Sequence, residues 1–219
     1  MNESQIDEIY SDRHPSLITR QAPEETFLSE PIYTEPLSYE PSLQWQNVTK
    51  EIDIKAKHGE GWVVLGKVFH KLFEELSKNI IEMDAVDKRA FTLLRYEIYN
   101  KHELKKMIEI IKDDFEKLSL SGHLRDIICP FKNSYVELPF ILQKGKTVFR
   151  GRIDRVIVKD NIAHIYDYKT FPVKEKEFPE LIDKYRFQMD IYREAVENIL
   201  KLRSKSYLLF THRPLLVEM

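Results

Sequence analysis

Two aspartates and a lysine near the ends of two predicted strands could form a catalytic cation site. Asp154 lies within the stretch 151–155, and Asp167-Tyr168-Lys169 ends the next run of alternating apolar residues. Because side chains alternate between the faces of a strand, Asp167 and Lys169 point the same way. Two carboxylates with backbone carbonyls suit Mg²⁺ or Mn²⁺. Such an ion could activate a water molecule against a phosphodiester, while the lysine orients or deprotonates that water. The alternative is an ordinary salt bridge between Asp167 and Lys169 at the end of a sheet.

Four further polar residues recur at spacings that fit the same site. Glu137 lies inside the first predicted strand, where the alternative is a glutamate on the exposed face. His70 follows Gly66 by four residues, at the border of an apolar helix stripe, where a purely structural histidine is the alternative. Gln188 and Tyr192 share one face of a later helix, which helix packing alone would also explain. These separate explanations do not account for the ordered combination.

The predicted elements that must hold these residues alternate between helices and strands. Apolar residues at helical spacing predict helices over about 61–78, 85–99, 103–118 and 181–200. Apolar, β-rich runs bounded by turn formers predict strands over 135–143, 147–159, 162–170 and 206–211, with a loop over 119–133. Helices followed by an antiparallel meander, a helix and a last strand predict an α/β fold with a mixed sheet.

These motifs together resemble the RecB-like branch of the PD-(D/E)xK nuclease superfamily, particularly the C-terminal nuclease domain of bacterial helicase–nuclease exonucleases that process DNA double-strand breaks. The motifs in family order are G-x₃-H, a glutamate on the first core strand, G-x-I-D, D-Y-K and Q-x₃-Y. The resemblance covers residues 61–211. It implies a restriction-endonuclease-like fold, with a mixed central sheet flanked by helices and an extended N-terminal arm.

The resemblance also implies roles for individual residues. His70, Asp154 and Asp167 match metal ligands, and the backbone carbonyl of Tyr168 completes the protein's share of the coordination. Lys169 matches the catalytic lysine.

The remaining motif residues match supporting roles. Glu137 matches an acidic residue that orders the site or contacts metal-bound water, so the expected catalytic set includes it. Gln188 and Tyr192 match a motif that supports the site and contacts the DNA backbone.

Residues near these motifs could also contact DNA. The basic residues that could follow phosphates are Arg150, Arg152, Arg155, Lys174, Lys176, Lys184 and Arg186, and the aromatic residues that could stack on bases are Tyr168, Phe171 and Tyr185. A solvated face or a core aromatic is the alternative for each. We expect single-stranded DNA ends as the substrate, because nucleases that are fed by a motor receive unwound strands.

Cysteine and motif content restrict the cofactors and partners. Cys129 is the single cysteine of the 219 residues, so the four-cysteine iron–sulfur cluster of some relatives cannot be built from this chain. The sequence has no G-x₄-G-K-[ST] phosphate loop, so a helicase motor would have to be a further portion of the protein or a separate partner. There is no apolar run of about 20 residues and no signal-peptide pattern, which favours a cytoplasmic protein without membrane contact.

Charge and proline are concentrated in the first fifty residues. Residues 1–50 contain five of the 10 prolines and a net charge of −6, whereas residues 51–219 carry a net charge of +4. We expect an acidic, Pro-rich arm or linker over 1–50, with a disordered tail as the alternative, and a nuclease domain over 51–219. By analogy with the helicase-fused relatives, the arm would tether the nuclease to the motor.

The sequence therefore predicts a Mg²⁺-dependent DNA nuclease, in which Mn²⁺ can substitute, belonging to an ATP-dependent helicase–exonuclease of double-strand break repair and recombination. Exonuclease action is favoured over endonuclease action. Two alternatives stay open: a stand-alone nuclease of the same branch, and a non-catalytic DNA-binding module of the same fold.

Overall fold

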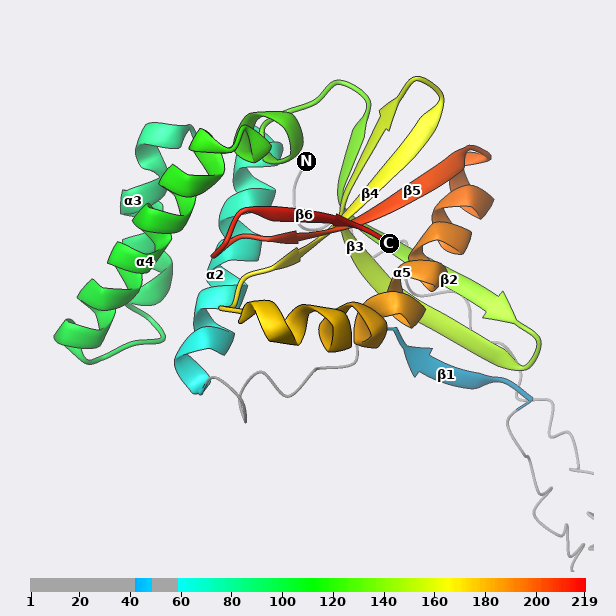
Figure 1. Cartoon of the computed structure of the whole chain (residues 1–219), viewed down its shortest axis with the longest axis horizontal. Coiled ribbons are helices and arrows are strands. Elements are labelled where there is room, and N and C mark those ends of the chain that lie inside the picture. Colours follow the sequence, from blue (N-terminus) through cyan, green and yellow to red (C-terminus); the bar gives the residue numbers. More distant parts are fainter. Residues whose placement is uncertain (1–41, 49–58) are drawn as a thin grey trace, which may run out of the picture. The chain divides into compact units, whose positions relative to one another are not determined.

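A mixed sheet of six strands is the centre of the computed structural model, which describes residues 42–48 and 59–219 (Figure 1). The strands are β1 (Gln44–Asn47), β2 (Ser134–Lys144), β3 (Thr147–Lys159), β4 (Ile162–Lys169), β5 (Arg203–Phe210) and β6 (Leu215–Glu218). β2 and β4 are antiparallel to β3, and β6 is antiparallel to β5. β1 is parallel to β3, and β4 is parallel to β5. The predicted α/β fold with a mixed sheet is confirmed.

Helices cover both faces of this sheet (Figure 1). They are α2 (Glu60–Ser77), α3 (Val86–Leu94), α4 (Lys101–Leu120) and α5 (Phe178–Leu200), with short 3₁₀ turns at Met83–Ala85 and Glu175–Glu177. Ile165 and Leu208 belong to the apolar core that contains α5. Tyr168 and Leu209 belong to a second core that contains α2, α3 and α4. Neighbouring residues of β4 and β5 therefore point into different cores, as the alternation of a strand requires.

The apolar stripe of α2 holds that helix firmly against the second core. Phe69 and Phe73 have no exposed surface, and both rings pack against Phe115 of α4, with centroids 6.0 and 5.4 Å away. Truncating a buried phenylalanine to alanine costs about 3–5 kcal/mol. The helix that carries His70 is therefore fixed by packing on both sides of that residue.

The second predicted helix is shorter than expected. It ends at Leu94 rather than near residue 99, and α4 begins at Lys101. The side chain of Asn100 accepts hydrogen bonds from the backbone amides of His102 (2.9 Å) and Glu103 (3.2 Å). An N-cap residue of this kind has extended backbone angles, so the chain must leave helical geometry before Asn100.

The loop predicted over 119–133 contains a short helix instead. A π-helical turn, Leu124–Ile128, occupies its middle. The fully buried guanidinium of Arg155 donates hydrogen bonds to the carbonyl oxygens of Ile127 and Cys129, both at 3.0 Å. Arg155 therefore anchors this turn to the sheet, and it is not available to follow DNA phosphates as the sequence suggested.

Two short strands were not predicted. β1 and β6 have four residues each, too few to show an alternating pattern. β1 falls within the segment 1–50 that was predicted as an arm, so the sheet begins before residue 51; residues 1–41 and 49–58 lie outside the described residues. Among the helices of the described part, none has the length and apolar character of a membrane span.

Candidate active site

Three carboxylates from neighbouring strands meet where β3 and β4 separate. The last backbone pair of these two strands joins Arg155 to Tyr166, and the next residues on each strand are Asp154 and Asp167. β4 then continues beside β5 up to Lys169. On the other side of β3, Glu137 occupies the place in β2 that faces Asp154. Residues from β2, β3 and β4 therefore form one row across the sheet at the fork.

Helix α2 adds a histidine to this row. His70 Nδ1 lies 3.3 Å from Asp154 Oδ1. A Cβ atom on Gly66, one turn earlier, would lie only 3.2 Å from the Thr170 hydroxyl, so the glycine lets α2 approach the end of β4. The glycine of the G-x₃-H motif thus allows α2 to pack closely against the end of β4, and the histidine one turn later contacts Asp154.

His70, Glu137 and Asp154 form the one group in the described residues that could hold a metal ion. One donor atom from each lies within 4.8 Å of the other two. The two carboxylates suit Mg²⁺ or Mn²⁺, whereas an imidazole is a more typical ligand of Zn²⁺, Fe²⁺ and other transition metals. The group therefore contains two of the three expected side-chain ligands, His70 and Asp154, together with Glu137.

The electrostatics of this group show how tightly the charges are gathered. Burial raises the pKa of Glu137, and the neighbouring Asp154 carboxylate raises it further. Burial acts to lower the pKa of His70, yet the charge and hydrogen bond of Asp154 raise it to about 9. Burial also opposes ionisation of Asp154, but His70 and the Tyr168 amide lower the pKa of this carboxyl overall. A bound cation would relieve the repulsion between Glu137 and Asp154.

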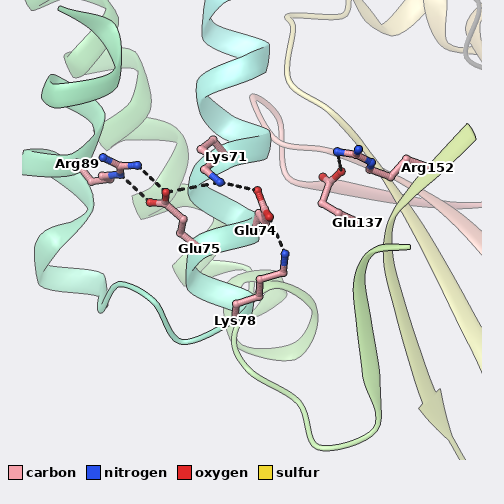
Figure 2. Close-up of polar contacts among 7 residues, drawn as sticks. All are labelled: Lys71, Glu74, Glu75, Lys78, Arg89, Glu137 and Arg152. Carbon is pink, nitrogen blue, oxygen red and sulfur yellow. Dashed lines mark hydrogen bonds and ion pairs between the residues drawn. The ribbon is translucent and has the colours of Figure 1, made fainter. Parts of the chain in front are cut away.

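Glu137 has an unusual backbone conformation. Its φ of 53° is in the left-handed region, which a residue with a side chain adopts at a cost of about 1–3 kcal/mol. Arg152 Nη1 lies 3.5 Å from Glu137 Oε2, and Figure 2 shows the two side chains facing each other. The strained backbone and the Arg152 contact together set the direction of the Glu137 side chain beside the two other ligand candidates.

Asp167 has a different set of neighbours from the metal-ligand group. Its Oδ2 forms an ion pair with Lys169 Nζ, and Gln188 Nε2 donates a hydrogen bond to its Oδ1 at 2.8 Å. Burial raises the pKa of Asp167, and Asp154 raises it too, against the effect of Lys169. The structure thus joins Asp167, Lys169 and Gln188 into a second group beside the first.

Helix α5 contributes the residues that contact this second group on the other face of the sheet from α2. Gln188 Nε2 lies 2.8 Å from the Tyr192 hydroxyl, which donates to the Arg152 carbonyl oxygen at 3.0 Å. One turn before Gln188, the ring of Tyr185 lies 3.7 Å from Lys169 Nζ. A cation over an aromatic face is stabilised by the ring. Sequence reasoning missed the contact between Tyr185 and Lys169, although the spacing of Tyr185, Gln188 and Tyr192 on one helix face was a usable signal.

The three aromatic residues proposed to stack on bases are buried. Tyr168 and Tyr185 are each 4% exposed and Phe171 is 5% exposed. The Tyr168 ring packs between His70 and Phe73, and its amide donates a 2.7 Å hydrogen bond to Asp154 Oδ2. These rings therefore lie inside the protein instead of reaching DNA, and those of Tyr168 and Tyr185 contact His70 and Lys169. The basic residues other than Arg155 that were expected near DNA, namely Arg150, Arg152, Lys174, Lys176, Lys184 and Arg186, are at least partly exposed.

An ion-pair network fixes α3 to α2 one turn beyond His70 (Figure 2). Glu75, 4% exposed, accepts two hydrogen bonds from the Arg89 guanidinium, at 2.8 and 2.7 Å. Lys71 and Lys78 both pair with Glu74, at 2.9 and 2.6 Å. The Arg89–Glu75 pair thus links α3 to α2, and the two lysines pair along α2 itself.

Comparison with known families gives one match that covers most of the chain. The family model described as the PD-(D/E)XK nuclease superfamily matches residues 44–216. That range includes β1 and every site residue described above.

Curated relatives match a smaller part. Large ATP-dependent helicase/nuclease subunits of Staphylococcus aureus, from strains JH9 and USA300, are 28% identical over 109 residues, covering 42% of this chain. The matched stretch is 9% of those relatives' own length. Among solved structures, a protein from Eubacterium rectale, provisionally described as an exonuclease, aligns with a TM-score of 0.46 and 13% identity, over 76% of this chain and 63% of its own.

Proposed function

Because the chain belongs to the PD-(D/E)XK nuclease superfamily, we propose that the strand fork is the active site of a metal-dependent DNA nuclease. The observation that carries the proposal is the pair of adjacent groups: three candidate ligands within 4.8 Å of one another, and a lysine ion-paired to the next aspartate. One group can hold a cation, and the other can place a positive charge beside a phosphate.

His70, Glu137 and Asp154 would hold the ion, with Asp167 as a further carboxylate next to them. When bound, a divalent cation supplies charge neutralisation at the phosphate and lowers the pKa of a coordinated water. His70 must give up its proton before its Nδ1 can act as a ligand, because its pKa of about 9 keeps the metal-free imidazole protonated. The Tyr168 carbonyl remains a proposed ligand from the resemblance.

Lys169 acts in this proposal as a cation. Burial tends to lower the pKa of Lys169, but Asp167 and the Tyr185 ring raise it overall, so the ammonium form persists at neutral pH. A charged Nζ suits the orientation of water and the stabilisation of charge on the phosphate better than proton abstraction. Gln188 and Tyr192 keep Asp167 in place for this role.

The substrate and the cellular setting extend the proposal. We take single-stranded DNA ends as substrate, Mg²⁺ as the ion with Mn²⁺ as a substitute, and no iron–sulfur cluster, since the chain has a single cysteine. The similarity to part of a helicase/nuclease protein supports a helicase motor as a further portion or a partner, with a role in break repair and recombination in the cytoplasm. The acidic segment predicted over 1–50 is then the proposed tether only up to β1, because the sheet and the family match already begin at residue 44.

The test is cleavage of labelled single-stranded DNA by the purified chain with Mg²⁺, with Mn²⁺ and with EDTA. We expect degradation with either metal and none with EDTA. Lys169→Met should abolish cleavage, whereas Lys146→Met, in the exposed turn between β2 and β3, should not. A DNA mobility shift without degradation in the wild type would instead identify a non-catalytic binding module.

A further inference from the structure

A buried aspartate outside the site holds a partly exposed histidine near the end of β4. Asp114 of α4 has no exposed surface, and its Oδ1 lies 3.0 Å from Nδ1 of His212, which is 98 residues away in the sequence. His212 follows β5, and its side chain is 33% exposed. Burying a carboxylate is costly, so a buried Asp114 with this partner calls for a reason.

The pair fixes the direction of the imidazole ring. Nδ1 faces Asp114, and the ring of Trp62 lies edge-on to His212, with centroids 5.4 Å apart. Within the described residues, Nε2 makes no hydrogen bond. Lys117 Nζ lies 3.9 Å from Asp114 Oδ1, so a cation also faces this pair from α4. A buried acid that orients a histidine and leaves its second nitrogen for a ligand is the arrangement used to position a functional imidazole.

The histidine is linked to the active site along α2. Three α2 residues at i, i+4 and i+8 contact successive parts of the sheet: Trp62 contacts His212, Gly66 approaches Thr170, and His70 contacts Asp154. All three α2 residues are partly exposed. Trp62 and His70 are separated by eight residues, or about 12 Å along the helix axis.

The backbone gives a second connection to the site. The amide of Thr211 donates a 3.0 Å hydrogen bond to the carbonyl oxygen of Lys169. The turn that carries His212 therefore starts directly beside the strand end that carries the lysine. His212 is therefore joined to the strand fork both along α2 and through this backbone contact.

From this geometry we propose that His212, positioned by Asp114, binds a backbone phosphate of the DNA strand beyond the scissile one. The proposal rests on the proposed function for its ligand. An imidazolium has two N–H donors on opposite sides of the ring, so Nδ1 donates to Asp114 and Nε2 donates to the phosphate oxygen. His212 is thus a binding residue, and Asp114 is a positioning residue.

Binding to a fluorescein-labelled single-stranded oligonucleotide in Ca²⁺, measured by anisotropy over a range of salt, tests the proposal without depending on cleavage. We expect His212→Gln to weaken binding about tenfold, which is typical of one lost charged hydrogen bond, and to reduce the salt dependence by about one phosphate contact. His102→Gln, an exposed histidine at the start of α4, is the matched control and should bind as the wild type does. Asp114→Asn keeps the size of the side chain and should weaken binding less than His212→Gln.

The competing explanation is that His212 only ties the turn to α4. In that case His212→Gln would lower the melting temperature but leave affinity and salt dependence unchanged, which would overturn the proposal. A wild-type protein that does not bind the oligonucleotide would overturn it too. A wild type that binds DNA normally but does not cleave it with Mg²⁺ would refute the proposed nuclease activity alone, because the His212 comparison needs only binding.

Discussion

Replacing Gly151 by alanine should disturb the active site from a distance, through Phe140. The two residues pair across β2 and β3, and an alanine Cβ would lie 2.9 Å from Phe140 Cε1 and 3.0 Å from Cζ. The Phe140 ring is 5% exposed and packs edge-on against Tyr192, at 5.5 Å. The Phe140 ring must therefore shift, and Tyr192, which donates to Arg152 and contacts Gln188, is one of the residues that it packs against.

Two opposite effects set the size of the stability change. Extra volume in a packed core costs about 1–3 kcal/mol. Replacing glycine by alanine lowers the conformational entropy of the unfolded chain, which stabilises the folded protein by about 0.4–1 kcal/mol. Gly151 does not have a positive φ, so alanine adds no backbone strain. We expect a net loss of about 0–2.6 kcal/mol in the free energy of unfolding.

A double-mutant cycle with Phe140→Leu isolates this contact. Urea unfolding should show that the double variant is more stable than the sum of the single effects predicts, by about 1 kcal/mol. In cleavage assays, Gly151→Ala should lower kcat more than it changes KM, because the displaced Phe140 ring disturbs the hydrogen-bonded chain Tyr192–Gln188–Asp167. Additive stabilities in this cycle would refute the reasoning.

Three further predictions concern metal binding, pH and the lysine. Gly66→Ala gains about 1 kcal/mol of helix propensity but pushes α2 away from Thr170. The Mn²⁺ affinity measured by calorimetry should therefore fall, while the melting temperature is kept. An unchanged Mn²⁺ affinity would show that the close approach of α2 does not determine the geometry of the metal-ligand group. Without metal, the pKa of His70 is about 9, above its ordinary 6.5. The protonated imidazole therefore stabilises the folded protein fully below pH 6.5, and this stabilisation is lost as the pH rises toward 9. Urea midpoints of the wild type measured from about pH 6 to 9 should show this loss, and those of His70→Gln should not. Lys169→Met should abolish cleavage and lower stability, because the buried Asp167 loses its cation; retained cleavage in a clean preparation would contradict the proposed role.

The sequence was sufficient for residues whose effect depends on local spacing. The strand alternation that placed Asp167 beside Lys169 and the helix spacing that placed Gln188 beside Tyr192 both hold in the structure, where the two pairs are in contact. The hairpin after β3 also put Asp154 and Asp167 on adjacent strands, as expected. These relations follow from the periods of strands and helices.

Relations set by packing could not be predicted in this way. Tyr185 was a candidate for base stacking, but its ring is buried and contacts Lys169. Arg155 was a candidate for binding phosphates, but it is buried and donates hydrogen bonds to the π-helical turn. The positive φ of Glu137 and the contact between Asp114 and His212 depend on how distant segments meet. A single sequence carries no periodic signal for such contacts.

The fork between β3 and β4 explains how residues from both sides of the sheet can act together. In a continuous sheet, backbone hydrogen bonds separate the α2 side from the α5 side, so His70 and Gln188 could not serve one site. Here the backbone pairing of β3 with β4 ends at Arg155. The Asp154 carboxylate, in place of a backbone carbonyl, accepts the hydrogen bond from the Tyr168 amide. Asp154 thereby contacts His70 from α2, while its neighbour Asp167 contacts Gln188 from α5. A change that restored strand pairing at this point would therefore separate the two groups without removing any of their residues.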